Sequence, residues 1–220
     1  MTVIRSERKE MRRAQAYCCA MSPELLLAFA VFALVSSITP GPNNLMLMAS
    51  GANFGWARTM PHALGVSIGF MLMVFLVGIG LGQFFHAFPV AQTVLKALCA
   101  AYLLYLAWKV ATAAPPSEEA RANAKPFTFT QAALFQWVNP KGWSMALTAI
   151  AAYAPTQDPA LCALIALTFG VINFPAVGLW MGMGVQMRRV LANPKALRVF
   201  NVAAALLLVA SLYPVVFASA

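Results

Sequence analysis

The stretch SSITPGPNNLM, from Ser36 to Met46, decides how this chain can fold. It places two prolines, one glycine and two asparagines between the apolar runs LLLAFAVFALV and LMLMA. Pro40 and Pro42 each lack a backbone N–H, and each disfavours the helical conformation in the residue before it. The stretch therefore predicts a helix that breaks in the middle of a hydrophobic region.

The composition of the chain indicates which solvent surrounds that helix. Of the 220 residues, 61% are hydrophobic and 10% are charged, and the mean hydropathy is +0.75. Soluble domains are about half apolar and about a quarter charged, so a soluble domain of this length could not bury so much apolar surface. Apolar stretches near the ~20 residues of a spanning helix predict an all-α membrane protein with six transmembrane helices. These stretches are 25–51, 62–83, 90–110, 128–153, 160–184 and 199–217.

Other classes of protein fit the sequence poorly. A β-barrel would show short segments of alternating hydrophobicity, whereas these apolar runs are long and continuous. The net charge of +9 does not indicate nucleic-acid binding, because the basic residues lie in the N-terminal tail and the connections. No cofactor or metal site is expected: Cys99 and Cys162 fall inside spans as small buried residues, and no CxxC pair occurs.

The sequence divides the chain into four regions. Residues 1–20 form a basic extension, and the Ser22–Pro23 pair that follows Met21 is suited to begin a helix, so we expect the functional protein to start at Met21. Residues 21–110 form a first three-helix half and 128–220 a second. The polar segment 111–127 is the cytoplasmic linker between them.

Loop charge predicts the orientation of the spans. The connections after the first, third and fifth spans carry basic residues, and the other connections carry none. The positive-inside rule therefore places both termini on the non-cytoplasmic side of the inner membrane. Because each half has three spans, the second half is expected to be inverted relative to the first. The basic residues are Arg58, Lys109, Arg121, Lys125, Arg188, Arg189, Lys195 and Arg198.

A second interruption lies at the matching place in the second half. The fourth span contains WVNPKGW, with Asn139, Pro140, Lys141 and Gly142 inside an apolar run. Two interrupted segments at corresponding positions are a sequence signal for a transporter site at the bilayer midplane. At such a site, half-helix N-termini can hold a carboxylate, and exposed carbonyls can hold an ammonium.

The candidate substrate-binding residues follow from these two interruptions. A third interruption, at Asn173 and Pro175 in the fifth span, adds lining. Lys141 could bind a substrate carboxylate, or its chain could extend to a membrane interface. The candidates are Pro40, Gly41, Pro42, Asn43, Asn44, Asn139, Pro140, Lys141 and Asn173.

Two alternatives stand beside the carrier hypothesis. The sequence GVSIG, residues 65–69, matches the GxSxG nucleophile elbow of an intramembrane enzyme, although that motif requires a strand before it. The helix breaks could also serve packing alone in a structural membrane protein. A homo-oligomer is compatible with either, and the lipid bilayer is the expected partner in every case.

The segment ITPGPNNLMLMASGANFGWARTMPHALGVSIG resembles the signature of the LysE/RhtB family of amino-acid exporters. The segments AAYLLYLAWKVAT and AKPFTFTQAALFQWVNPKGW are most similar to its cysteine/O-acetylserine efflux branch. The resemblance implies six spans, an inner-membrane location and export of small amino acids such as cysteine, O-acetylserine, homoserine or threonine. The expected function is therefore a secondary carrier that works by alternating access.

Overall fold

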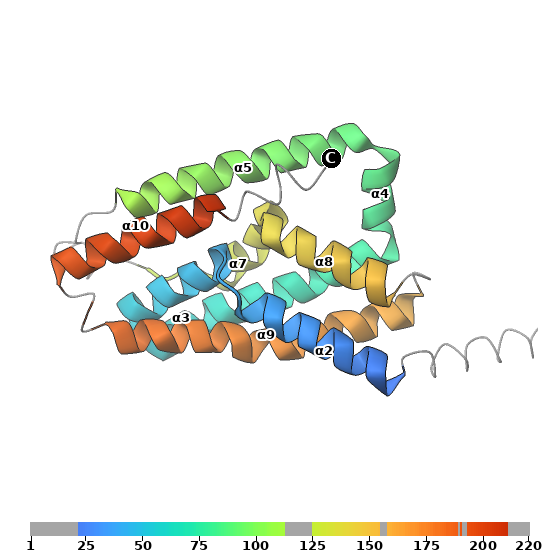
Figure 1. Ribbon diagram of the computed structural model, residues 1–220, viewed down its shortest axis with the longest axis horizontal. Coiled ribbons are helices and arrows are strands. Elements are labelled where there is room, and N and C mark those ends of the chain that lie inside the picture. The colour runs from blue at the N-terminus through green and yellow to red at the C-terminus, as the bar shows by residue number, and fades with distance from the viewer. Residues whose placement is uncertain (1–21, 113–124, 155–157, 189, 191–192, 211–220) are drawn as a thin grey trace, which may run out of the picture.

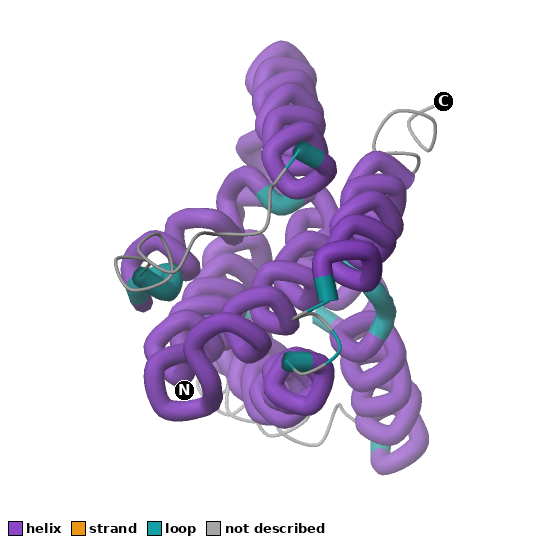
Figure 2. The backbone as a smooth tube through the Cα atoms, turned by 90° about the vertical axis from the view of Figure 1, so that its left-hand side faces the viewer, coloured by secondary structure: helices purple, strands orange, loops and turns teal. Residues whose placement is uncertain are grey.

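The computed structural model describes residues 22–112, 125–154, 158–188, 190 and 193–210, and every regular element in these ranges is a helix (Figure 2). The predicted all-α class is therefore confirmed for the described part of the chain. The basic extension 1–20, Met21 and most of the linker 111–127 lie outside it. The elements are α2 (Pro23–Ile38), α3 (Pro42–Leu76), η1 (Val77–Leu81), α4 (Gly82–Ala87), α5 (Pro89–Ala111), α7 (Phe129–Phe135), η2 (Gln136–Val138), α8 (Pro140–Tyr153), α9 (Pro159–Met187) and α10 (Pro194–Ala210).

Three helical segments in the described residues are long and apolar enough to cross a membrane. They are Pro42–Phe84, Pro89–Trp108 and Pro159–Met187, and α2 is a shorter apolar helix. The first of them has 43 residues, which at 1.5 Å per residue would extend to about 64 Å if straight. Since a hydrocarbon core is only about 30 Å thick, this segment must fold back.

The reversal occurs at Gly55, which has φ 75° and ψ −178°. This conformation favours glycine, because a Cβ atom is strained there. The corner brings together Ser50, which precedes it, and His62, which follows it: Ser50 Oγ lies 3.0 Å from His62 Nδ1. In a straight helix, 12 residues would separate them by about 18 Å. The sequence predicts a loop at 52–61, between the first two spans. This prediction is wrong, because these residues are helical on both sides of Gly55.

The predicted breaks lie where the prolines place them. Ser22 caps α2 by accepting a hydrogen bond from Leu25 N at 3.2 Å, and α2 ends at Ile38, before Pro40. Helix α3 then begins at Pro42. In the second half, α7 tightens into the 3₁₀ turn η2, and α8 begins at Pro140. Both prolines occupy the first helical position, where the missing N–H costs no intrahelical bond.

The third predicted interruption is wrong. Helix α9 runs without a break from Pro159 to Met187, with Pro175 inside it. A single internal proline removes one backbone hydrogen bond, which a buried helix in a packed bundle can accommodate. The Pro40–Gly41–Pro42 sequence, with two prolines around a glycine, cannot continue as helix.

Helices α5 and α10 run antiparallel, and the part of α3 after Gly55 runs antiparallel to α9 (Figure 1). Helix α9 packs along α3 over most of its length, and α10 packs beside α5. Helix α4 runs across the end of the bundle and leads from α3 to α5. Helices α2 and α8 lie with their broken ends toward the middle of the bundle (Figure 1). This arrangement brings the two interruptions to the same depth.

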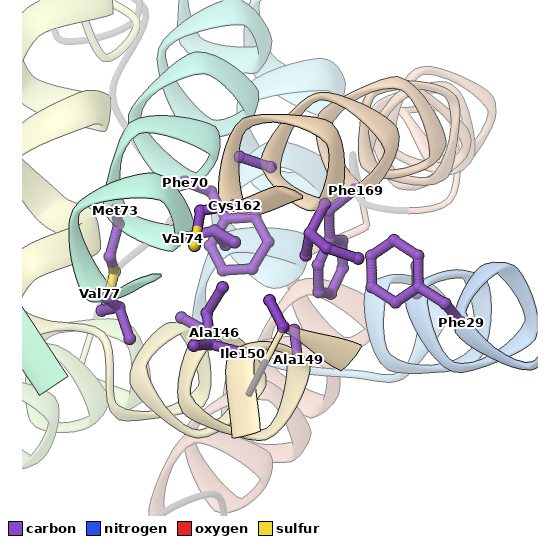
Figure 3. Packing of buried hydrophobic residues seen from close by; sticks show 14 of the residues in the cluster. Phe29, Phe70, Met73, Val74, Val77, Ala146, Ala149, Ile150, Cys162 and Phe169 are labelled. Carbon is purple, nitrogen blue, oxygen red and sulfur yellow. The ribbon is translucent and has the colours of Figure 1, made fainter. Parts of the chain in front are cut away.

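An aromatic core joins α2, α3, α8 and α9 (Figure 3). Phe169 lies at its centre, with its ring centroid 4.8 Å from Phe70 and 5.6 Å from Phe29 in edge-to-face geometry. Such aromatic pairs add to the free energy gained by burying their area. The predicted burial of Cys99 and Cys162 is confirmed, because both are at most 2% exposed.

Candidate functional site

The two helix breaks lie against each other and are joined by an amide pair. Asn43 Nδ2 donates to Gln136 Oε1 at 2.8 Å, and Gln136 Nε2 donates back to Asn43 Oδ1 at 3.2 Å. Gln136 Nε2 also donates to Ala132 O at 2.8 Å, and Gln136 is fully buried. The amide of Gln136 therefore connects the first turn of α3 to the turn η2 that precedes α8.

Around the break after α2, every backbone carbonyl from Val35 to Gly41 accepts a hydrogen bond. Backbone groups at this depth must be satisfied inside the protein, because lipid offers no hydrogen bonds. One of the donors is nearby in the sequence: Asn44 Nδ2 donates to Ser37 O and to Thr39 O, both at 2.8 Å. The remaining donors are Thr39 N to Val35 O, Thr39 Oγ1 to Ser36 O, Trp180 Nε1 to Ile38 O, Lys141 Nζ to Thr39 O and Pro40 O, and Leu45 N to Gly41 O.

Lys141 reaches across from α8 to the end of α2. Its Nζ donates to Thr39 O at 2.6 Å, to Thr39 Oγ1 at 2.9 Å and to Pro40 O at 3.4 Å. The C-terminal end of a helix carries partial negative charge, so a cation is favoured there. The side chain thus turns inward to the break, and it does not extend to a membrane interface in this conformation.

The two helices that follow the breaks begin differently. Asn139 caps α8, because its Oδ1 accepts from Lys141 N at 3.2 Å. Helix α3 has Gly41 at the capping position, with no side-chain cap. The first-turn N–H groups of a helix have no intrahelical partner, so the amides of Asn43 and Asn44 face the break without a capping side chain. An uncapped helix start beside a polar cavity suits an anion such as a carboxylate.

Asn173 lies between α2 and α3 rather than at an interruption. Its Nδ2 donates to Ser37 Oγ at 3.1 Å, and its Oδ1 accepts from Ser67 Oγ at 3.3 Å. Ser67 is the central residue of the GxSxG match, and it lies inside the helix α3 without a preceding strand. The motif therefore supplies a polar link between helices, not a nucleophile elbow.

A small polar cavity lies where these groups meet. Its volume is about 20 Å³, which is enough for one water molecule and too little for an amino acid. Six of the predicted site residues line it, and the three prolines Pro40, Pro42 and Pro140 do not. The lining residues are Ser36, Ser37, Gly41, Asn43, Asn44, Phe70, Asn139, Lys141, Gly142, Met145, Asn173 and Val177.

Apolar clusters lie on both sides of the cavity. Toward the start of α2 lies the aromatic core around Phe169. Toward the Gly55 corner lies a second cluster, in which Leu47 from α3 packs against α7 and α9. The remaining members of that cluster are Ala63, Val66, Ala132, Val177 and Met181. The cavity therefore lies between two apolar clusters of the bundle.

Two residues that hydrogen-bond to predicted site residues were missed at the sequence level. Gln136 lies three residues before Asn139 within FQWVNPKGW, and its pairing with Asn43 could be expected only once the two breaks were known to touch. Ser37 lies in the quoted SSITPGPNNLM stretch, and its hydrogen bonds from Asn44 and Asn173 place it in the site. Polar residues inside an apolar run were the signal that could have identified both.

A second buried polar pair lies away from the cavity. Ser50 Oγ contacts His62 Nδ1, and the His62 ring stacks on Phe127 with centroids 5.2 Å apart. Thr59, one turn before His62, is fully buried, and its Oγ1 has no hydrogen-bond partner. Among the described residues, no group of three His, Cys, Asp or Glu side chains could hold a metal ion.

Comparison with known proteins identifies the family. The family described as "LysE type translocator" matches residues 9–212. The chain is 32% identical over 186 residues to proteins named "Cysteine/O-acetylserine efflux protein" in Escherichia coli (strain K12) and Shigella sonnei (strain Ss046), with 78% of this chain and 94% of each relative covered. A protein of the same name in Escherichia coli O1:K1 / APEC is 31% identical over the same shares.

No solved structure matches the chain at a significant level. Because the family match covers nearly the whole chain, this protein belongs to the LysE type translocator family and is a transport protein rather than an enzyme.

Proposed function

We propose that this protein is a secondary carrier that exports a small amino acid from the cytoplasm across the inner membrane. The observation that carries the proposal is the polar cavity between two broken helices in an otherwise apolar bundle. Irregular backbone is tolerated at membrane depth only where it is buried in protein or lines a wet cavity. Polar groups at such a place mark the path of a polar solute.

The substrate class follows from the site and from the relatives. The cavity has an uncapped helix start at Gly41, and the carbonyl oxygens of Thr39 and Pro40 lie next to its lining residues Gly41 and Lys141. These groups complement the carboxylate and the ammonium of a zwitterion. The similar proteins are named for efflux of cysteine and O-acetylserine, so we infer a small, neutral amino acid of that kind, with homoserine and threonine as further candidates.

The site residues divide into two roles in this proposal. Asn43, Asn44, Asn139, Lys141 and Asn173 bind the substrate or hold the groups that bind it. Their side chains line the cavity and meet in one hydrogen-bonded region. The remaining candidates, Pro40, Gly41, Pro42 and Pro140, shape the breaks that expose these groups.

Alternating access between two inverted halves is the mechanism we propose. In this scheme, α2 and the part of α3 before Gly55 correspond to α7 and α8, the part of α3 after Gly55 corresponds to α9, and α5 corresponds to α10. The contacts between α3 and α9 and between α5 and α10 are consistent with a twofold axis through the breaks. A cavity of about 20 Å³ cannot hold the substrate, so loading requires the two breaks to separate.

Loop charge supports the orientation of the protein in the membrane. Arg58 lies just after the Gly55 corner, and Arg188 and Lys195 flank the connection between α9 and α10. Basic connections favour the cytoplasmic side, so both termini would lie on the other side. The substrate would then enter from the side of the Gly55 corner and leave past the aromatic core.

Export from overexpressing cells tests the proposal. Cells are loaded with a panel of cysteine, O-acetylserine, homoserine and threonine, and each compound is measured in the medium with and without a proton gradient. We expect Asn43→Ala to lower export of the preferred compound at least about tenfold. The matched control is Asn53→Ala, because Asn53 is exposed on the same helix and its Nδ2 bonds only to Ala49 O within that helix.

The outcome that would reject the proposal is clear. It fails if no amino acid accumulates above cells with an empty vector while the protein reaches the membrane. The site assignment alone fails if export occurs and Asn43→Ala behaves like Asn53→Ala.

A further inference from the structure

The ammonium group of Lys141 is held in the manner in which proteins hold a small ligand. Three oxygens surround its Nζ, two from Thr39 and one from Pro40, at 2.6, 2.9 and 3.4 Å. The α-ammonium of an amino acid carries the same charge and the same three donor hydrogens. The oxygens around Nζ could therefore accept either cation.

We propose that Lys141 occupies the α-ammonium subsite of the empty carrier and that the substrate displaces it on binding. This inference rests on the proposed function, because it assigns one subsite of the proposed amino-acid site. It gives Lys141 a role opposite to the carboxylate ligand considered from the sequence. The lysine competes with the substrate instead of attracting it.

The charge distribution around the cavity supports this assignment. The residues that line the cavity include no aspartate or glutamate. The carbonyls of Thr39 and Pro40 lie beside this lining, at the C-terminal end of α2, where partial negative charge favours a cation. A substrate ammonium placed at the position of Lys141 Nζ would meet these same oxygens.

Both cations cannot occupy the subsite together. Two positive charges within a few ångströms of each other repel. The lysine chain also crosses Gly41: a Cβ atom at Gly41 would lie 2.6 Å from Lys141 Cδ. The lysine side chain thus fills the space beside the subsite, and its flexible stem allows it to move away when a ligand enters.

The exchange would serve a function in the transport cycle. When the substrate leaves, the lysine ammonium returns to the same oxygens, so the C-terminal end of α2 keeps a cation in the empty carrier. The empty site can therefore close without a ligand. The competition also lowers the apparent affinity for substrate, because part of the binding free energy displaces the lysine.

Equilibrium binding to the purified, detergent-solubilised protein tests the inference. The probe is whichever of O-acetyl-L-serine, L-cysteine, L-homoserine and L-threonine binds the wild type most tightly. In Lys141→Met the side-chain length is nearly kept and the charge is lost, so we expect the Kd to fall about tenfold. The 2-hydroxy acid with the same side chain lacks the ammonium, and its Kd should change less than about twofold.

Two further variants keep the test decisive. Lys141→Gln retains an amide donor near the freed carbonyls, and it replaces Lys141→Met if the latter does not fold; its Kd for the amino acid should also fall. Lys96→Met removes a lysine from α5, outside the cavity lining, and should leave both Kd values unchanged.

The outcomes separate this inference from the proposed function. If no amino acid binds the wild type, the proposed function fails. If the wild type binds and the Lys141 variants bind the amino acid equally well or more weakly, the competition model is overturned. Weaker binding would assign Lys141 to the substrate carboxylate, and unchanged binding would leave it a helix cap only.

Discussion

The side-chain amides of Asn43 and Gln136 form a reciprocal pair across 93 residues of sequence, with N···O distances of 2.8 and 3.2 Å. One partner lies in the first turn of α3, and the other lies in the 3₁₀ turn before α8. The pair holds two irregular segments together in a bundle where lipid cannot replace a lost hydrogen bond. In the alternating-access proposal, this pair and the contacts of Lys141 with Thr39 and Pro40 must yield for the cavity to open between the breaks.

The first prediction concerns the coupling of this pair. Asn43→Ala and Gln136→Ala each leave one buried amide without its partner, and the double variant removes both. In a double-mutant cycle we expect an interaction free energy of roughly 1 kcal/mol. The measurement is the apparent Tm of each purified variant in one detergent. Additive effects of the two substitutions would show that the amide pair contributes nothing to stability.

The second prediction concerns the capping of α2. Asn44 donates to two carbonyls, Ser37 O and Thr39 O, and is itself buried. Asn44→Asp keeps the size of the side chain and removes the donor, so at least one carbonyl loses its partner at a cost of about 2 kcal/mol. The apparent Tm should fall, whereas Asn53→Asp on the exposed face of α3 should change it little. Equal Tm values for the two variants would show that the hydrogen bonds from Asn44 to Ser37 O and Thr39 O do not stabilise the protein.

The third prediction concerns the corner between the first two membrane-crossing segments. Gly55 has φ 75° and open space around its Cβ position, so the cost of Gly55→Ala is conformational strain alone. We expect a loss of about 1 kcal/mol, measured as a lower apparent Tm. Gly178→Ala is the matched control, because it also has open space but lies within helix α9. The control should leave the apparent Tm unchanged or raise it slightly. An unchanged apparent Tm for Gly55→Ala would mean that the backbone at residue 55 changes its conformation without loss of stability.

The fourth prediction concerns the aromatic core. Phe169 is fully buried and contacts the rings of Phe29 and Phe70. Phe169→Ala should cost roughly 4 kcal/mol, because it combines the lost transfer free energy with an unfilled cavity. Val171 on the same helix is 72% exposed, and Val171→Ala should have little effect. Chemical unfolding of both variants in mixed micelles compares them directly, and similar midpoints would argue against the core described here.

By itself the sequence determined the helical class and the helix breaks at Pro40–Pro42 and at Pro140. Apolar length predicts the spans, and the prolines at 40, 42 and 140 interrupt helices for a local reason: each removes a backbone donor and restricts its neighbour. The site candidates on these breaks, such as Asn43, Asn139 and Lys141, were accessible for the same reason, because a polar residue inside an apolar run is visible without coordinates.

Only the tertiary structure decided which groups satisfy one another. A glycine may turn or merely loosen a helix, and the corner at Gly55 follows from its conformation in the packed bundle. Pro175 looked like the other interruptions, yet neighbouring helices support an unbroken α9. The partners Asn43–Gln136 and Lys141–Thr39 are separated by 93 and 102 residues. Such pairing depends on how the helices pack, and the local sequence around each residue does not specify that packing.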